Sequence, residues 1–291
     1  MTFNDNADIS SGRVSRRGRN TAIGIGGGGG VLAIAVLLIS AFTGVDLTGL
    51  VPSGGGEQPV QEEFLDCEAA EANTNDDCRV QGATASLDDY WAEQAPGLGF
   101  EYNTPGVNIF EGSTSTGCGN ATSAVGPFYC PADQSIYLDT SFYEQLRSQF
   151  GASGGPLAQM YIIAHEWGHH IQTITGINSN LDFQTTGPES DGVRLELQAD
   201  CFAGAWVGAA STIEDADGVT FLEPVTKQQI ADALNAASSV GDDNIQEQTQ
   251  GQTNPESWTH GSSASREKWF QIGYEGGPNA CNTFEVAGSE L

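Results

Sequence analysis

The stretch His165-Glu166-Trp167-Gly168-His169 (HEWGH) decides how this 291-residue chain is interpreted. It follows an apolar run, residues 160–164, that is typical of a buried helix. Residues four apart lie on one face of a helix, so both imidazoles can reach one metal ion. Glu166 then lies close enough to act on a water molecule at that ion. The spacing therefore predicts a hydrolytic metal site, although such a pattern can also occur by chance on an ordinary helix.

A third ligand is expected from the next long helix, predicted over residues 191–210. Catalytic zinc usually has three protein ligands and an open fourth position. Only two histidines remain outside the motif, so a carboxylate is the expected ligand, and Glu196 is the candidate. Asp200 shares its helix face and could accept the second N–H of a ligand histidine. The alternative for Asp200 is a surface or capping carboxylate. One zinc ion, with Glu166 as general base, is the expected site.

The two histidines outside the metal motif have different expected roles. His170 points about 100° away from the neighbouring ligand on an α-helix, so we expect it to pack or to support the site. His260 lies in Trp258-Thr259-His260-Gly261, just before the last predicted helix. It is either an ordinary loop histidine or a donor to the oxyanion that forms when water attacks a carbonyl. Trp167 is expected in the core.

The charge of the chain is strongly acidic and excludes one class of partner. There are 38 acidic and 10 basic residues, which gives a net charge of −28. Such a surface repels phosphate backbones, so no nucleic-acid partner is expected. Solubility, or adaptation to the surrounding medium, is the preferred explanation over specific cation binding.

The first 62 residues predict a membrane anchor. No charged residue occurs between Arg19 and Asp46, and residues 21–45 are long enough to cross a bilayer. Arginines before this stretch predict a cytoplasmic N-terminus, with residues 1–20 forming a basic, disordered tail. Residues 46–62 are rich in glycine and read as a flexible linker. The rival interpretations are a cleaved signal peptide, for which no good cleavage pattern follows, and a twin-arginine signal.

The cysteines agree with a location outside the cytoplasm. All six lie beyond the predicted anchor, and an even number indicates disulfides in an oxidising compartment. Six cysteines allow 15 pairings, so the sequence alone does not fix them. Proximity in the sequence favours Cys67–Cys78 and Cys118–Cys130, which leaves Cys201–Cys281 as the third pair. A cysteine zinc site is the weaker alternative because the chain contains no C-x-x-C.

Short strands precede long helices in the part predicted to fold, residues 63–291. After a short helix near residues 86–94, strands are expected at residues 107–110, 127–130 and 135–138. Helices are expected over residues 141–150, 156–175, 191–210, 226–239 and 263–274. This order favours an α+β domain over a series of βαβ units.

Several motifs together resemble one known family. They are Cys118-Gly119, Gly126-Pro127-Phe128-Tyr129-Cys130-Pro131, Tyr137-Leu138-Asp139, His165-Glu166-Trp167-Gly168-His169-His170-Ile171-Gln172, Glu196-Leu197-Gln198-Ala199-Asp200-Cys201, Thr259-His260-Gly261, Arg266 and Trp269-Phe270. The chain resembles the neutral zinc metallopeptidases, membrane-anchored bacterial proteins of gluzincin type. The resemblance implies a zincin-like fold behind a single transmembrane helix and makes His260 a site residue. It also implies an edge strand that binds substrate backbone, with Phe128-Tyr129-Cys130 or the strand next to it as the candidate.

Two functions from different classes follow from the sequence. The first is a membrane-tethered peptidase, single-pass and with its catalytic domain outside the cytoplasm, that hydrolyses proteins or peptides. The second is a non-catalytic binding module of the cell envelope in which zinc only stabilises the fold. Glu166 favours the first, because a structural site needs no general base. Hydrolysis of a cell-wall amide is a third possibility, and the sequence predicts neither the substrate nor the oligomeric state.

Overall fold

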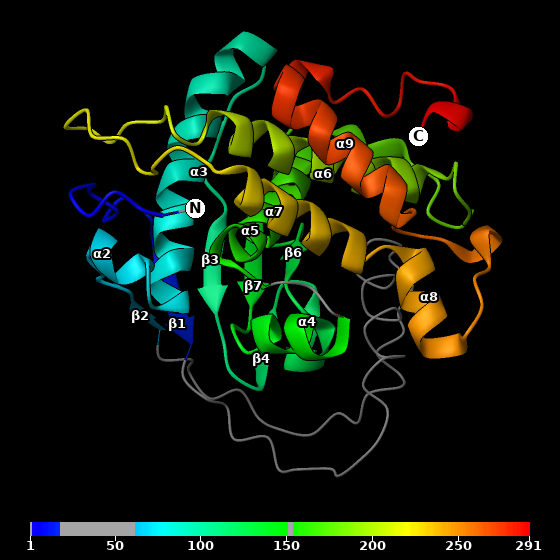
Figure 1. Ribbon diagram of the computed structural model, residues 1–291, viewed down its shortest axis with the longest axis horizontal. Coiled ribbons are helices and arrows are strands. Elements are labelled where there is room, and N and C mark those ends of the chain that lie inside the picture. The colour runs from blue at the N-terminus through cyan, green and yellow to red at the C-terminus, as the bar shows by residue number, and fades with distance from the viewer. Residues whose placement is uncertain (1, 18–61, 151–153) are drawn as a thin grey trace.

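A mixed sheet and a set of helices form an α+β fold, as predicted (Figure 1). The computed structural model describes residues 2–17, 62–150 and 154–291. The strands are β1 (Val14–Arg17), β2 (Glu62–Phe64), β3 (Gly106–Ile109), β4 (Ser113–Thr116), β5 (Gly119–Thr122), β6 (Phe128–Cys130) and β7 (Ser135–Leu138). The α-helices are α2 (Ala69–Ala72), α3 (Asp76–Leu98), α4 (Phe142–Phe150), α5 (Pro156–Ile174), α6 (Asp191–Ala209), α7 (Lys227–Ser239), α8 (Asp242–Gln250) and α9 (Ser263–Gly276).

The main sheet has the strand order β2-β1-β3-β7-β6. Its three inner strands run parallel, and each edge strand pairs antiparallel with its neighbour. Strands β4 and β5 form a separate antiparallel hairpin. Strand β6 is therefore an edge strand, next to the helix that carries the HEWGH motif. The three strands predicted from the sequence are β3, β6 and β7.

The prediction that the first 20 residues form a disordered tail is wrong for residues 2–17. Strand β1 lies inside the sheet, paired with both β2 and β3. Phe3, Ile9 and Val14 are buried in the main hydrophobic core. The tail was predicted from its polar, basic composition, but three well-spaced apolar side chains and a strand between two partners are enough to order it. The folded domain therefore includes these residues.

The predicted anchor, residues 21–45, lies outside the described residues, as does the predicted linker up to residue 61. Residue 62, which was assigned to that linker, begins β2. Across the described ranges, no helix is both long enough and apolar enough to cross a membrane.

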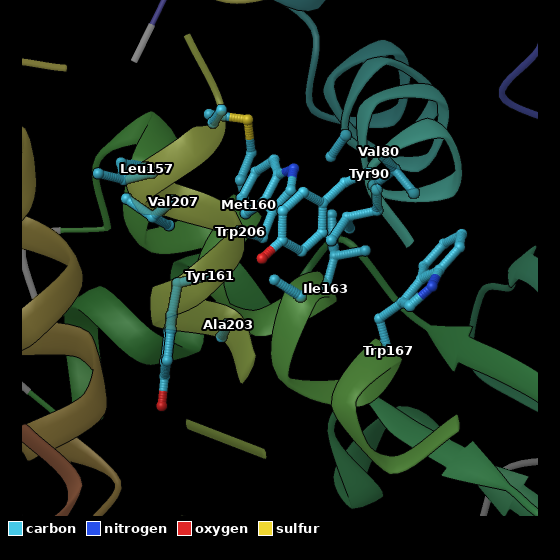
Figure 2. Close-up of a cluster of buried hydrophobic side chains, with 14 of the residues drawn as sticks. Val80, Tyr90, Leu157, Met160, Tyr161, Ile163, Trp167, Ala203, Trp206 and Val207 are labelled. Atoms are coloured by element: carbon cyan, nitrogen blue, oxygen red, sulfur yellow. The ribbon is translucent and has the colours of Figure 1, made fainter. Parts of the chain in front are cut away.

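Helix α5 runs through the middle of the fold and is buried along nearly its whole length. Pro156 is its first residue, where a backbone N–H would have no partner within the helix. The helix ends just before Gly176, as predicted. Its apolar side chains meet those of α3 and α6 in the cluster of Figure 2, where Met160 and Ile163 lie near Tyr90 and Trp206. Trp167 is fully buried, in agreement with its expected place in the core.

Helix α6 packs closely against both α5 and α9. A Cβ atom built on Gly168 of α5 would lie 2.9 Å from the Cα atom of Ala199 in α6. Likewise, a Cβ atom on Gly204 of α6 would lie 2.0 Å from the carbonyl oxygen of Phe270 in α9. Glycine at these positions lets the three backbones approach, and α6 is thereby fixed against the motif helix.

All three predicted disulfides are confirmed. Cys67 is joined to Cys78, Cys118 to Cys130, and Cys201 to Cys281. The last of these ties the C-terminal segment to α6, one residue after Asp200. The second holds the β4–β5 hairpin against the edge strand β6.

Candidate metal centre

Three side chains from two helices converge in the way the sequence predicted. The Nε2 atoms of His165 and His169, both on α5, lie 3.2 Å apart. Glu196 on α6 places one carboxylate oxygen 3.2 Å from the Nε2 atom of His165 and the other 3.5 Å from that of His169. The three residues retain only 3 to 8% of their surface exposed. They form a group that could hold a metal ion.

The hydrogen bonds around this group leave three potential ligand atoms facing one another. The Nδ1 atom of His165 lies 2.8 Å from the Asp200 carboxylate, and that of His169 lies 2.8 Å from the side-chain oxygen of Gln172. Both partners are acceptors, so each ring keeps a proton on Nδ1, and its Nε2 atom is the one that would offer a lone pair to a metal ion after losing any proton of its own. Two imidazole Nε2 atoms and a carboxylate thus point at one location.

The spacing of these donor atoms fits zinc. Zinc–nitrogen and zinc–oxygen bonds of about 2.0–2.2 Å at tetrahedral angles put neighbouring donors about 3.3–3.5 Å apart. The separations of 3.2, 3.2 and 3.5 Å agree closely with that geometry. Two nitrogens and one carboxylate are also a donor set that catalytic zinc sites use. His165, His169 and Glu196 would hold the ion.

The buried carboxylates and imidazoles of this group shift one another's pKa values strongly. Burial lowers the pKa of His165, but Asp200 and Glu196 outweigh burial and raise this pKa to about 10. Burial lowers the pKa of His169 to about 4. Burial would raise the pKa of Glu196, yet the two histidines hold it well below its usual range. The carboxylate of Glu196 therefore stays negatively charged between the two histidines.

Asp200 lies behind His165 in a fully buried network. Arg266 of α9 donates two hydrogen bonds to the Asp200 carboxylate, at 2.8 and 2.9 Å. Tyr161 donates its hydroxyl hydrogen to the same carboxylate and accepts a hydrogen bond from Arg266 at 3.2 Å. Asp200 is 0% exposed, so the alternative of a surface carboxylate is wrong. The guanidinium balances its charge, and the carboxylate fixes the ring of His165.

Glu166 lies between the ligand group and the edge of the sheet. Burial raises the pKa of its carboxyl group to about 7, and the charge of Glu196 acts in the same direction. The backbone N–H of Tyr129 in β6 lies close to this carboxylate and acts to lower its pKa. A carboxyl group with a pKa near neutrality can both take and return a proton, as a general base must. Its contact with β6 links the HEWGH helix to the edge strand.

His260 lies near the ligand group and is held by Asp242. One carboxylate oxygen of Asp242 accepts the backbone N–H groups of Thr259, His260 and Gly261, at 2.7, 2.6 and 3.0 Å. Its other oxygen lies 3.4 Å from the Nδ1 atom of His260. Burial lowers the pKa of His260, but Asp242 and Glu196 raise it overall. Asp242 thus holds both the backbone and the ring of His260 in place beside the ligand group.

His170 has the supporting position expected of it. Its Nε2–H group donates to the carbonyl oxygen of Asn103 at 2.6 Å, and its Nδ1 atom accepts from the hydroxyl of Tyr129 at 3.1 Å. Burial lowers its pKa to about 4, so the ring is neutral. His170 therefore holds β6 against α5.

Sequence reasoning assigned no role to four residues that complete the site: Tyr161, Gln172, Asp242 and Arg266. Arg266 was noted only as part of a motif. Basic residues are rare in this chain, with 10 against 38 acidic ones. An arginine in a predicted helix therefore indicated an acidic partner nearby. Asp242 and Tyr161 carry no local signal, because their partners belong to other elements of the fold: the loop before α9 for Asp242, and α6 and α9 for Tyr161.

A second candidate group of metal ligands in the described ranges is Cys67, Glu71 and Cys78. Its two sulfur atoms are joined in a disulfide and are not available as thiolates. This group is therefore a disulfide and not a metal site.

Comparison with known proteins connects this geometry to one family. The profile of the family described as "Putative neutral zinc metallopeptidase" matches residues 3–284. Among curated relatives, Uncharacterized protein Rv2575 of Mycobacterium tuberculosis is 50% identical over 220 residues, 75% of this chain and 74% of its own. Uncharacterized protein YpfJ of Escherichia coli is 38% identical over 268 residues, 89% of this chain and 87% of its own. No solved structure matches the chain.

Proposed function

The chain belongs to the neutral zinc metallopeptidase family, and from that premise we propose that it hydrolyses peptide bonds in proteins or peptides. The convergence of His165, His169 and Glu196 on one location, with Glu166 beside it, carries this proposal. One zinc ion is the proposed cofactor. When bound, it would lower the pKa of a water molecule and polarise the carbonyl group of the substrate.

The residues around the site have separate proposed roles in the reaction. Glu166 takes a proton from the attacking water onto its carboxylate and later gives it to the leaving amine, which a pKa of about 7 allows. His260, held by Asp242 and with a raised pKa, donates a hydrogen bond to the oxygen that becomes negative. Asp200 keeps the Nδ1 proton on His165, and Gln172 does the same for His169.

The fold proposed around this chemistry is zincin-like, with the substrate lying along β6. An extended peptide can add to an exposed sheet edge through backbone hydrogen bonds. Strand β6 is an edge strand, and its residue Tyr129 reaches Glu166. A peptide beside β6 would therefore have its backbone next to the general base. His170 supports this arrangement by holding Tyr129.

The proposed location is outside the cytoplasm, at the surface of a membrane that residues 21–45 contact. Three disulfides fit an oxidising compartment, where such bonds form and persist. The acidic surface makes nucleic acid an implausible substrate.

The test compares the full chain with its Glu166→Gln variant. Both are expected to hold about one zinc ion, because Glu166 is not among the three ligands. Peptide hydrolysis, measured on a mixed peptide library by mass spectrometry, is expected to fall at least about 100-fold in the variant. Glu101→Gln, which changes an exposed glutamate elsewhere, is the matched control and should cut normally. If the wild-type chain binds zinc and cuts nothing, the proposal fails and the non-catalytic binding module becomes the better explanation.

A further inference from the structure

The N-terminal segment, residues 2–17, is built into the same folded unit as the candidate metal centre. We infer that this segment lies on the same side of the membrane as the metal centre. Its last part is β1, an interior strand in which Ser15 lies opposite both Phe64 of β2 and Asn108 of β3. The hydroxyl of Ser15 donates to the side chain of Asn108 at 2.7 Å. An interior strand cannot be removed without opening the sheet.

The first part of the segment makes specific contacts with distant parts of the chain. Phe3 is 2% exposed, its ring lies against Gly82 of α3, and it forms a β-bridge with Leu222. The side chain of Asn73 accepts the Phe3 N–H at 2.8 Å and donates to the Phe3 carbonyl at 3.1 Å. The backbone N–H of Asp8 donates to Asp215 at 2.7 Å. These contacts involve residues from both halves of the chain, so the segment is an integral part of the domain.

Three arginines that suggested a cytoplasmic tail have partners within the fold. Arg16 forms an ion pair with Asp77 of α3. Arg17 donates to the carbonyl oxygen of Ser115 at 2.8 Å, and its guanidinium lies 5.0 Å from the ring centre of Tyr137. Arg13 lies 4.7 Å from the ring centre of Phe64. These contacts within the fold explain the three arginines without placing the N-terminus in the cytoplasm.

The pairing of β1 with β2 brings Arg17 and Glu62, the residues on either side of residues 18–61, next to each other. Arg17, the last residue of β1, lies directly opposite Glu62, the first residue of β2. Paired strands place such residues about 5 Å apart, whereas one crossing of a bilayer separates its ends by about 30 Å. In the folded sheet, Arg17 and Glu62 therefore lie on the same side of the membrane.

A disulfide introduced between β1 and β2 tests the inference in the full chain. The Leu65 N–H donates to the Val14 carbonyl at 2.9 Å, so Ser15 and Phe64 form the adjacent pair without mutual hydrogen bonds. Cα atoms in such a pair lie about 4.5 Å apart, within the range that a disulfide spans. The double variant Ser15→Cys with Phe64→Cys, expressed in bacterial membranes, is expected to crosslink, as seen by mass spectrometry of non-reduced peptides.

The matched control is Asn6→Cys with Phe64→Cys, in which the first cysteine lies on the same segment but not opposite Phe64. It should not crosslink. A second measurement uses single cysteines at two exposed positions, Asn6→Cys and Gln184→Cys, and a membrane-impermeant maleimide on cells with an intact inner membrane. Equal labelling of both supports the inference. If Gln184→Cys reacts while Asn6→Cys reacts only after the membrane is permeabilised, and the Ser15/Phe64 pair stays reduced, the inference is overturned.

Discussion

Arg266 holds together the buried network of Asp200 and Tyr161 behind the ligand His165. Its guanidinium is the positive partner of Asp200, and both side chains are almost completely buried. Removing one partner of a buried ion pair leaves an uncompensated charge and costs about 3–5 kcal/mol. Arg266→Met is therefore expected to lower the free energy of unfolding by about that amount in urea titrations. It should also weaken zinc binding about 10- to 100-fold, as measured against a competing chelator.

The same helix provides the control for this prediction. Lys268→Met removes an exposed positive charge from α9 and should change stability by less than about 0.5 kcal/mol. A double variant, Asp200→Asn with Arg266→Met, removes both charges, so its loss should be smaller than the sum of the single losses. Additive losses would show that the two side chains do not act as a pair.

Asp242 acts at a distance from the reacting atoms by holding the backbone around His260. His260→Ala is expected to lower kcat about 100- to 1000-fold, as for other donors to an oxyanion, while zinc stays bound. Asp242→Asn should lower kcat in the same direction but by less, because the imidazole remains and only its position is loosened. Steady-state kinetics with a cleaved peptide measure both effects.

The neighbouring Asp243 separates positioning of His260 from general stability. Asp243 holds Ser263 at the start of α9 and does not contact His260. Asp243→Asn is thus expected to lower stability and leave kcat unchanged. An equal loss of kcat in both aspartate variants would contradict the role given to Asp242.

Acidification should destabilise the fold in part through the carboxylate of Asp242. Burial would raise the pKa of Asp242, but hydrogen bonds from His260 and from backbone N–H groups lower it overall. A pKa that is lower in the folded than in the unfolded chain stabilises the fold above the unfolded value of about 3.9. That stabilisation is lost as the pH falls through the folded value.

At the scale of elements, the site depends on how closely α5 and α6 approach. Gly168 faces Ala199, and a Cβ atom there would lie 2.9 Å from the Ala199 Cα atom and 3.1 Å from its carbonyl oxygen. Gly168→Ala must therefore push α6 away, at a cost of about 1–3 kcal/mol. Glu196 lies one turn from Ala199, so it moves away from the two histidines. Zinc affinity is expected to fall together with stability.

Gly97→Ala is the matched control for this substitution. Gly97 also lies in a helix, but a Cβ atom there would meet nothing within 4 Å. Alanine at this position is expected to leave zinc affinity unchanged and to stabilise the helix by about 0.5–1 kcal/mol. Unchanged zinc affinity in Gly168→Ala would show that the position of Glu196 does not depend on the contact between α5 and α6.

The elements that could be predicted from the sequence are those whose signal is local. Helical spacing alone brought His165 and His169 together, and the apolar periodicity of α5 and α6 made Glu196 a sound candidate. The partner of Arg266 could not be assigned, because Asp200 is brought to it by the packing of α6 against α9. Asp242 could not be assigned either, because the fold of the loop before α9 places residues 259–261 around it. Strand β1 was missed for the same reason: Val-Ser-Arg-Arg is polar, and its order comes from β2, β3 and α3.

At the scale of the whole molecule, the stability of the domain depends on the N-terminal segment, residues 2–17. Removing residues 1–61 would take Phe3, Ile9 and Val14 from the core, at about 1.5–3 kcal/mol for each side chain. The sum, roughly 5–9 kcal/mol, is comparable with the whole stability of a typical domain, about 5–15 kcal/mol. The piece 62–291 would also expose the unpaired edges of β2 and β3, which favours aggregation.

The full chain is therefore expected to unfold at a clearly higher urea concentration than the piece 62–291, and to remain monodisperse in size-exclusion chromatography. A synthetic peptide of residues 2–17, added in excess, should restore part of the stability, because binding to the folded state alone shifts the unfolding equilibrium. A peptide of the same composition in scrambled order is the control. If the piece 62–291 unfolds at the same urea concentration as the full chain, β1 contributes nothing to the fold, and the order of the sheet would need to be revised.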